Sequence, residues 1–462
     1  MRLHDTMARG VVDVVPARRG ELRVYACGPT VYRYAHVGNM RTFLLTDLIR
    51  RVAELHKLTV TVVQNVTDVG HLVDDTNDSG EDKVLAQARR EGRTTQEIAE
   101  FYTAAFHRDL AALNIRPADE EPKASDWIAP MVELIERLVA KGHAYPTADG
   151  SVFFDARSWP SYGALSGNRL DALVAGHRTE GEVHAQKRFH ADWALWKGAG
   201  PNRAQTWQTP WGAGFPGWHV ECSAMSLALL GETIDVHTGG IDLRFPHHED
   251  ERAQSEAAVA HPVVRHWVHG EHLLFEGRKM AKSTGNVVLV SDVAERGHDP
   301  LAVRLSFLGS RYRTQINLTW DEIAAADRTL ARWRDRVRQW AESPSKPTCA
   351  GYDARFRAAL DDDLDTPAAL QVLRDVERDT TIPDGSKFET FAAFDRALGL
   401  DLVRDVGRPP TALPPGAADL LDQRERARAA KDFAAADRLR DDLAALGVTV
   451  RDTATGQDWS AT

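Results

Sequence analysis

The fold is decided by the stretch ELRVYACGPTVYRYAHVGNMRTFLLTDLIRRVAELHKLTVTVVQ, Glu21–Gln64. Its first part, ELRVYAC (Glu21–Cys27), has the composition of a buried strand, and LTVTVVQ (Leu58–Gln64) is a second strand rich in β-branched residues. Between them, apolar residues recur at helical spacing from Gly38 to Leu58. A strand, a helix and a strand within about 45 residues form a βαβ unit, which predicts a parallel sheet with a right-handed crossover.

The turn after the first strand carries residues that can hold a nucleotide. Cys27 ends the strand, and parallel sheets bind ligands beyond the carboxyl ends of their strands. His36 and Gly38 open the next helix, where free backbone N–H groups and the helix dipole favour phosphate. From this stretch alone two interpretations stay open: a nucleotide site beside a thiolate, or a buried structural cysteine and a surface histidine.

Composition sets the outer limits of the interpretation. A chain of 462 residues is too long for one ordinary core and predicts several domains. An apolar fraction of 43% and a charged fraction of 27% are typical of a soluble globular protein, and no apolar run is long enough for a membrane span. The N-terminus lacks a secretory signal pattern, and three cysteines make no disulfide framework, so we expect a cytoplasmic protein. The net charge of −10 still allows a local RNA-binding face.

The pattern changes several times further along the chain. The βα rhythm is lost between Pro117 and Gln208, which indicates an insertion of short strands and turns. Helices and strands return in GWHVECSAMSLALLG (helix), TIDVHTGG (strand), HHEDERAQSEAAVA (helix) and WVHGEHLLF (strand, Trp267–Phe275). A helical pattern then runs from Leu301 to Trp340, with more helix to Leu400 after a linker. A Pro-rich linker precedes a compact tail that begins near Ala417.

A charged loop, KMAKSTGN (Lys279–Asn286), is the second candidate for phosphate binding. Lys279 and Lys282 can place two mobile ammonium groups on a polyphosphate. Considered alone, this signal is weak, because charged loops are usually just solvated.

A third group of residues is suited to a metal. Cys222 follows a turn, and His247 and Glu251 are four residues apart, hence on one helical face. Together with Cys27 they offer two thiolates, an imidazole and a carboxylate, which make a plausible zinc site. His248 is a further candidate ligand, and the alternative is a core cysteine with a surface His/Glu pair.

The motifs HVGN and KMAKS resemble the two signatures of class I aminoacyl-tRNA synthetases, His-x-Gly-His and Lys-Met-Ser-Lys-Ser. The sequence departs from them at Asn39 and Ala281. Asn39 can still donate a hydrogen bond to phosphate, and Ala281 leaves both lysines in place, so we expect neither departure to abolish activity.

Over essentially its whole length the chain resembles the cysteinyl-tRNA synthetase family. The resemblance is carried by the stretches YACGPTVY, HVGNMRTF, NVTDVGHL, DWALWK, TPWGAGFPGWHVECSAMS, GGIDLRFPHHEDE and KMAKSTGN. It implies an α/β fold, with a Rossmann-type catalytic core split by an insertion, then an α-helical domain and a small C-terminal anticodon-recognition module. The implied segments are 1–116 (first half of the core), 117–208 (connective insertion), 209–272 (second half), 273–320 (stem-contact region with the KMAKS loop), 321–408 (helical anticodon-stem domain) and 409–462 (linker and C-terminal module).

The resemblance also implies a role for individual residues. One Zn²⁺ per chain is held by Cys27, Cys222, His247 and Glu251, which favours His247 over His248. The cysteine pocket is formed by Thr67 and Trp218. ATP is bound by Gly38, Gly239, Gly240, Asp242 and Lys282, with Mg²⁺ on its phosphates. Catalysis is positioning and charge neutralisation by His36, Asn39, Lys279 and Lys282.

The implied reaction explains why a thiol sits at the end of the first strand. Cysteine and serine differ by one atom, and a pocket that senses only size or apolarity separates such analogues by roughly 1–3 kcal/mol. Zinc binds a substrate thiolate, and a hydroxyl group is a much weaker zinc ligand. The expected products are cysteinyl-adenylate and pyrophosphate, followed by transfer of cysteine to tRNA(Cys), and we expect a monomer without membrane contact.

The tail discriminates between possible acceptors of the cysteinyl group. A related mycothiol-pathway ligase joins cysteine to an amino sugar and lacks an anticodon module, and a paralogue that only makes the adenylate is another alternative. The tail here resembles the synthetase's module, with Arg424 and Arg428 on one helix face for an RNA backbone and Trp459 for stacking on a base. Without the resemblance, these arginines would be read as an ordinary solvated helix face.

Overall fold

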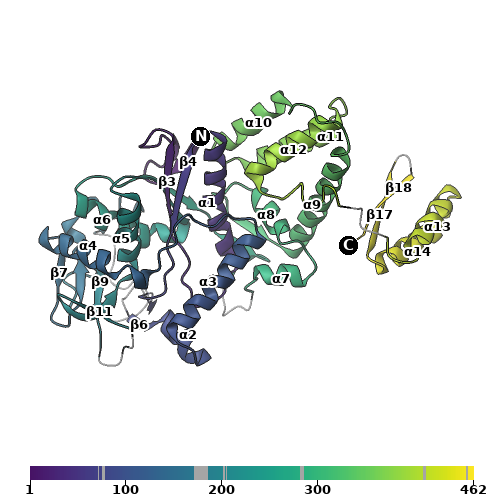
Figure 1. The fold of residues 1–462 in the computed structure, drawn as a ribbon. Coiled ribbons are helices and arrows are strands. Elements are labelled where there is room, and N and C mark those ends of the chain that lie inside the picture. Colours follow the sequence, from purple (N-terminus) through teal and green to yellow (C-terminus); the bar gives the residue numbers. More distant parts are fainter. Residues whose placement is uncertain are drawn as a thin grey trace. The chain divides into compact units, whose positions relative to one another are not determined.

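The structure is a computed structural model, and it describes residues 1–70, 72–74, 79–170, 186–200, 203, 205–280, 286–408, 413–453 and 456–461. The chain divides into two compact units, Met1–Arg404 and Asp405–Thr462 (Figure 1). Within the described ranges, every helix is too short or too polar to cross a lipid bilayer.

A four-stranded parallel sheet organises the first unit, in the order β13-β12-β3-β4. Strands β3 (Glu21–Ala26) and β4 (Thr59–Gln64) are joined by helix α1 (Val37–Leu55), as the sequence pattern predicts. Strand β12 (Ile234–Gly240) pairs with β3, and β13 (Val264–Gly270) lies on its other side.

The two faces of this sheet bury different sets of elements. Alternate side chains of a strand point to opposite faces, so Leu22 and Val24 pack with α1 whereas Tyr25 and Cys27 pack with α5 (Trp218–Leu230) and α6 (His247–Val259). The crossover through α1 leads from β3 to β4, and the crossover through α6 leads from β12 to β13 in the opposite direction. The strand order therefore reverses between β3 and β12, which is where open α/β sheets bind ligands.

The insertion forms its own five-stranded antiparallel sheet, in the order β10-β11-β9-β8-β7. Helix α4 (Ile128–Ala140) precedes its strands, which are β7 (Ala144–Pro146), β8 (Val152–Phe154), β9 (Trp193–Gly198), β10 (Trp207–Thr209) and β11 (Gly212–Pro216). This sheet continues to Pro216, so the boundary expected at residue 208 cuts through one of its hairpins.

Two expected elements are divided in the structure. The strand predicted over Trp267–Phe275 is wrong as one element, because β13 ends at Gly270 and β14 (Leu273–Phe275) pairs with β15 (Arg278–Lys279) and β16 (Ile316–Leu318) in a separate sheet. That same strand β16 interrupts the helical pattern predicted from Leu301 to Trp340. A run of apolar residues does not by itself show where the chain passes from one sheet into another.

The remaining elements of the first unit are mostly helical. The N-terminal part adds β1 (Arg2–Asp5), β2 (Gly10–Asp13), β5 (Leu72–Asp74), β6 (Ser79–Asp82), α2 (Lys83–Glu91), α3 (Thr95–Ala112) and the 3₁₀ turns η1 (Ala124–Asp126), η2 (Ala156–Ser158) and η4 (Ile241–Arg244). The part after the sheet contains α7 (Val290–Glu295), α8 (Leu301–Leu308), α9 (Trp320–Trp340), α10 (Ala350–Asp361), α11 (Thr366–Arg378) and α12 (Asp384–Leu398).

The second unit is a helical hairpin with a β-hairpin. Helices α13 (Ala417–Ala429) and α14 (Phe433–Ala445) are followed by β17 (Val448–Thr453) and β18 (Gly456–Ala461). Its small core consists of Ala417, Leu421, Leu443, Val448 and Val450.

A buried ion-pair cluster, the Asp47 junction, fastens α1 to the helices that follow the sheet. The Asp47 carboxylate on α1 accepts hydrogen bonds from Arg304 of α8 at 2.7 Å and from Arg51 at 2.8 Å. Arg304 also donates to the backbone oxygens of Leu398 at 2.6 Å and Leu113 at 3.0 Å. One carboxylate therefore connects the first crossover helix to α8, to the end of α3 and to the end of α12.

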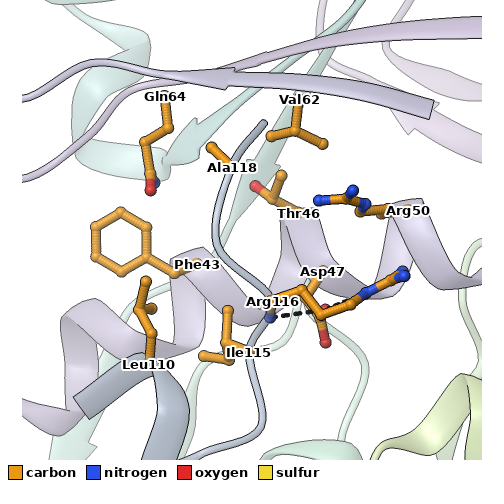
Figure 2. Close-up of a pocket in the computed structure, with 10 residues that line it drawn as sticks. All are labelled: Phe43, Thr46, Asp47, Arg50, Val62, Gln64, Leu110, Ile115, Arg116 and Ala118. Carbon is orange, nitrogen blue, oxygen red and sulfur yellow. Dashed lines mark hydrogen bonds and ion pairs between the residues drawn. The ribbon is translucent and has the colours of Figure 1, made fainter. Parts of the chain in front are cut away.

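A small cavity adjoins the Asp47 junction on the α1 face of the sheet. Figure 2 shows Phe43 and Gln64 at one end and Arg116, which reaches Asp47, at the other. Its volume is about 20 Å³, enough for a water molecule. It is too small to hold a nucleotide or an amino acid.

Candidate functional site

The four residues expected to bind metal converge at the carboxyl edge of the sheet. Cys27 directly follows β3, and its backbone N–H donates to the Thr238 carbonyl of β12 at 3.3 Å. Cys222 comes from α5, which packs on α6, and α6 supplies His247 and Glu251 one turn apart. Parallel pairing of β3 with β12 thus brings residues from distant parts of the chain to one place.

The donor atoms of this group, the Cys/His/Glu cluster, lie within 4.8 Å of one another and all four residues are buried. The Sγ atoms of Cys27 and Cys222 are 3.9 Å apart. Cys27 Sγ lies 3.5 Å from Glu251 Oε1, and Cys222 Sγ lies 3.6 Å from His247 Nε2. The His247 Nε2 and Glu251 Oε1 atoms are 3.0 Å apart.

These separations match the edges of a tetrahedron around zinc. With Zn–S bonds near 2.3 Å and Zn–N or Zn–O bonds near 2.0 Å, the edges should be about 3.8 Å for two sulfurs, about 3.5 Å for sulfur with nitrogen or oxygen, and about 3.3 Å for nitrogen with oxygen. The donor set, two thiolates with an imidazole and a carboxylate, is also one that zinc accepts. The cluster therefore fits zinc in both chemistry and spacing.

Burial and mutual contact shift the acidities inside the cluster. Burial raises the pKa of the Cys27 thiol well above its usual value, and the neighbouring Cys222 raises it further. Burial also raises the pKa of Glu251, but His237 and His247 more than offset this, so the pKa lies well below its usual range. For His247, burial lowers the pKa, but the Glu251 charge outweighs it and the pKa is raised. A carboxylate and an imidazole that are already paired hold this arrangement together.

A second donor set overlaps the first. Cys27, His237, His248 and Glu251 also lie within 4.8 Å of one another, and His248 Nε2 is 3.2 Å from Cys27 Sγ. This set has one sulfur instead of two. Within this set, His237 Nε2 is hydrogen-bonded to Glu251 Oε2 at 2.8 Å. His248 Nδ1 is hydrogen-bonded to His269 Nε2 at 2.9 Å. Geometry alone leaves both sets open.

Several buried polar residues that support the cluster were missed by the sequence reasoning. His219 Nδ1 lies 2.7 Å from His247 Nδ1, and Asn65 Oδ1 lies 3.6 Å from Cys222 Sγ. His237 lies in β12, whose residues are all buried, and His269 lies in the buried C-terminal part of β13. The usable signal was the histidines of VHTGG and WVHG, because a polar residue inside a buried strand needs a partner there.

The two residues expected to form an amino-acid pocket flank the cluster. The Trp218 ring stacks on His247 with 4.2 Å between ring centroids. Thr67 is buried, donates to Glu221 Oε2 at 2.9 Å and accepts from Asn65 Nδ2 at 3.0 Å. Asn65 in turn faces Cys222, so Thr67 is connected to the cluster through one side chain.

His36 and Asn39, expected to bind phosphate, form the N-terminal cap of α1. The His36 ring accepts from the Asn39 backbone N–H at 3.2 Å, and the Asn39 side chain accepts from the His36 backbone N–H at 3.1 Å. Burial and then the charge of Arg33 lower the pKa of His36 to about 4, so its imidazole is neutral near pH 7. A Cβ on Gly38 would come within 2.7 Å of Met280 Cε and 3.1 Å of the His36 ring, so a side chain here would require both neighbours to shift.

The remaining nucleotide-binding candidates lie at the end of β12 and in the lysine loop. Gly239 and Gly240 end β12, and a Cβ at Gly239 would lie 2.5 Å from the His248 ring, so this position requires glycine. Asp242 follows in η4. Lys279 is exposed in β15, whereas Lys282 lies outside the described residues.

The candidates for RNA contact in the second unit differ in exposure. Arg424 is buried, with 1% of its surface exposed, and pairs with Asp452 at 2.9 Å and Gln457 at 2.8 Å. The expectation that Arg424 offers its guanidinium to RNA is therefore wrong, since this side chain holds α13 against the hairpin. Arg428 also pairs with Asp452 but is partly exposed, and Trp459 is 37% exposed.

The fold and this site together define a class I aminoacyl-tRNA synthetase. Solved structures of that class have the same fold: the methionyl-tRNA synthetase of Mycobacterium tuberculosis aligns with a TM-score of 0.56 over 90% of this chain and 96% of its own, at 16% identity. A leucyl-tRNA synthetase of Agrobacterium radiobacter aligns with a TM-score of 0.59 over 84% of each chain, at 11% identity.

Sequence comparison narrows the class. Residues 13–328 match the family described as the class I (C) tRNA synthetase catalytic domain, and residues 411–459 match the cysteinyl-tRNA ligase anticodon binding domain. The cysteine–tRNA ligases of Thermus thermophilus and Deinococcus radiodurans are 42% and 40% identical, each over 99% of this chain and over 98% and 96% of their own lengths. The chain belongs to the cysteinyl-tRNA synthetase family.

Proposed function

We propose that this protein activates L-cysteine with ATP to form cysteinyl-adenylate and pyrophosphate, and then transfers the cysteinyl group to tRNA(Cys). The observation that carries the proposal is the buried Cys/His/Glu cluster, whose donor atoms lie within 4.8 Å of one another at the ligand-binding edge of the sheet. Two sulfur donors there suit a metal that recognises a third sulfur, and cysteine is the amino acid that brings one.

Cys27, Cys222, His247 and Glu251 would hold one zinc ion. When bound, zinc would supply a soft Lewis acid that binds the substrate as its thiolate and leaves serine without an equivalent contact. Trp218 stacks on His247 and so covers one side of this pocket, which keeps water away from the thiol. Thr67, fixed by Asn65 and Glu221, presents a polar group at the pocket wall for the α-amino or carboxylate group.

The adenylate forms when the cysteine carboxylate attacks the α-phosphorus of ATP and pyrophosphate leaves, so no protein nucleophile is required. The catalytic assignment consists of His36, Asn39, Lys279 and Lys282. A neutral His36 can donate a hydrogen bond to a phosphate oxygen, and the two lysines neutralise charge that develops on the leaving pyrophosphate. Gly38, Gly239, Gly240 and Asp242 lie at or near the same edge of the sheet and would contact the nucleoside, with Mg²⁺ on the phosphates.

The acceptor is proposed to be tRNA(Cys), not an amino sugar. The match of residues 411–459 to an anticodon binding domain supports this choice, because an amino-sugar acceptor has no anticodon to bind. In this unit, Arg428 and Trp459 keep enough exposure to contact RNA. We further propose that the protein acts as a monomer in the cytoplasm, where translation takes place and thiols stay reduced.

A single comparison tests the proposal. The enzyme is incubated with ATP, Mg²⁺ and labelled cysteine, and either tRNA(Cys) or an amino-sugar acceptor is added. We expect label on the tRNA at a catalytic rate, none on the sugar, and none on tRNA when serine replaces cysteine. Label on the sugar alone would refute the assignment, and sedimentation of the same preparation tests the monomer.

A further inference from the structure

A cluster of aromatic rings lies on the surface beside the turn that carries His36. Tyr34, in the loop before α1, meets Phe101 and Tyr102 of α3, with centroid separations of 6.1 Å and 5.2 Å, and Phe101 and Tyr102 are 5.1 Å apart. Tyr34 is 42% exposed and Phe101 is 37% exposed. These three rings are called the aromatic platform: Tyr34 and Phe101 are exposed, and the buried ring of Tyr102 supports them. Exposed apolar groups that gather in this way mark a binding surface.

Two guanidinium groups accompany the rings. Arg93 lies 4.9 Å from the Phe101 ring centroid, and Arg33 lies 5.1 Å from the centroid of Tyr32. Arg93 is neutralised by Glu91 at 3.4 Å, whereas Arg33 makes no ion pair with any residue that the structure describes. The platform therefore carries a spare positive charge on the side nearest His36.

The platform is built on a rigid base. The loop of Tyr34 is pinned where the Val31 N–H donates to the Thr67 carbonyl at 3.1 Å, and the Tyr102 hydroxyl donates to Glu91 at 2.8 Å. Beneath the two exposed rings, Tyr102 belongs to one buried apolar cluster with Val31, Val66 and Ile98. The same loop thus connects the platform to Thr67 of the amino-acid pocket and to His36 of the nucleotide site.

We propose that the aromatic platform binds the unpaired 3′ nucleotides of the acceptor tRNA by stacking, with Arg33 on their phosphates. The inference rests on the proposed function, because transfer requires the terminal ribose hydroxyl of the tRNA to reach an adenylate held beside His36 and Thr67. Single-stranded RNA ends are bound by aromatic side chains and arginine planes, and any base can stack. Exposed rings, a spare arginine and continuity with the reaction site match that occupant.

The test is a thermodynamic cycle between one ring and the RNA end. Binding of intact tRNA(Cys) and of the same tRNA without its unpaired 3′ nucleotides is measured for the full-length protein and for Phe101→Leu, which keeps apolar volume but has no flat ring. We expect trimming to weaken binding to the unsubstituted protein by about tenfold or more. The affinity of Phe101→Leu for intact tRNA should be about as low as the affinity of the unsubstituted protein for trimmed tRNA. Trimming the tRNA should lower the affinity of Phe101→Leu only slightly further. Phe101→Trp should restore the full loss on trimming.

Matched variants keep the test decisive. Phe433→Leu removes another exposed phenylalanine, in the second unit, and should keep the full loss on trimming. Arg33→Gln should reduce the slope of log affinity against log salt by about 0.7. If thermal unfolding shows that Phe101→Leu is misfolded, Tyr34→Ala replaces it in the cycle.

The outcomes separate this inference from the proposed function. Equal losses on trimming in Phe101→Leu and in the unsubstituted protein would overturn the aromatic platform while tRNA charging stands. An unsubstituted protein that binds tRNA(Cys) but transfers no cysteine to it would overturn the proposed function itself.

Discussion

At the scale of single residues, several side chains of the site are already paired with one another. His247 and Glu251 are paired at 3.0 Å, and Asn65 links Thr67 to Cys222. Such pre-arranged donors lose little conformational freedom when a metal or substrate arrives, which favours tight and selective binding.

Replacing Cys222 by serine should remove most of the zinc and most of the cysteine-dependent exchange of pyrophosphate into ATP. Serine shortens the donor and is a poor ligand for zinc at neutral pH. Metal analysis of the purified variant and the exchange assay measure both effects. Cys349→Ser is the matched control, since Cys349 caps α10 away from the cluster, and it should keep zinc and exchange. A Cys222→Ser protein with full metal and full exchange would contradict the assignment.

The His36 imidazole should titrate near pH 4 in the ligand-free protein instead of near its ordinary value of about 6.5. Burial and the Arg33 charge both disfavour the imidazolium, so the ring stays neutral as the pH falls to about 4. ATP brings negative charge and should raise this pKa. NMR titration of labelled histidines, with His36→Asn to assign the signal, checks both statements. A ligand-free pKa at or above the ordinary value would show that the ring is not desolvated.

Motifs indicated which residues meet at the candidate site, and their role as metal ligands stays a prediction. Spacing alone failed where exposure depends on tertiary contact. Cys27, Cys222, His247 and Glu251 were selected from sequence, and the structure brings them together. Arg424 was selected as an RNA contact because helical spacing places it beside Arg428, yet it is buried against Gln457. Spacing reports which residues share a helix face but does not say which face another element will cover.

At the scale of elements, the Asp47 junction determines how α1 is fixed to the helices after the sheet. Burial raises the pKa of Asp47, but Arg304 and Arg51 outweigh it, so the pKa lies below its usual value and the carboxylate is charged. This contribution to stability is therefore present above about pH 4 and is lost as the pH falls through the lowered pKa of the folded state.

Asp47→Asn should lower the free energy of unfolding by about 3–5 kcal/mol, because it removes the ion-pair partner of the fully buried Arg304. Urea unfolding at pH 7 measures the loss, and the loss relative to the unsubstituted protein should shrink at acid pH. Asp361→Asn removes a half-exposed carboxylate paired with His56 and should cost about 1 kcal/mol or less. Equal losses in the two variants would mean that the junction is not a special support.

The element predictions show where sequence patterns stop being informative. The βαβ unit was read correctly because β3, α1 and β4 are consecutive and each has its own period. The single strand expected at Trp267–Phe275 was wrong, because an apolar run looks the same whether it stays in one sheet or passes into the next. Pairing partners such as β12 with β3, or β14 with β16, are set by the whole fold.

At the scale of the whole molecule, the features of the candidate site and the match to an anticodon binding domain lie in different compact units. The sheet, the Cys/His/Glu cluster and the α1 cap all belong to Met1–Arg404, whereas the match to an anticodon binding domain lies in the other unit. We therefore expect the first half-reaction to require only the first unit, and recognition of the correct tRNA to require both.

Deleting the tail from Ala417 onward should leave pyrophosphate exchange nearly intact while transfer of cysteine to tRNA(Cys) falls steeply, mainly through a higher KM for tRNA. Intact enzyme should also lose transfer rate as salt rises, since phosphate contacts release counterions. Exchange and charging assays on both proteins, across a range of salt, measure these effects. A truncated protein that charges tRNA as well as the intact one would contradict the role of the tail.

The position of the cluster in the sequence has a consequence for biosynthesis. Cys27 and Cys222 are 195 residues apart, and the last ligand, Glu251, follows later still. After β3 has been synthesised, the ribosome must therefore synthesise the whole insertion before β12 can pair with β3. During that interval the nascent chain carries an unprotected thiol. A shortage of reductant would consequently harm this protein most while it is being made, and far less once it has folded.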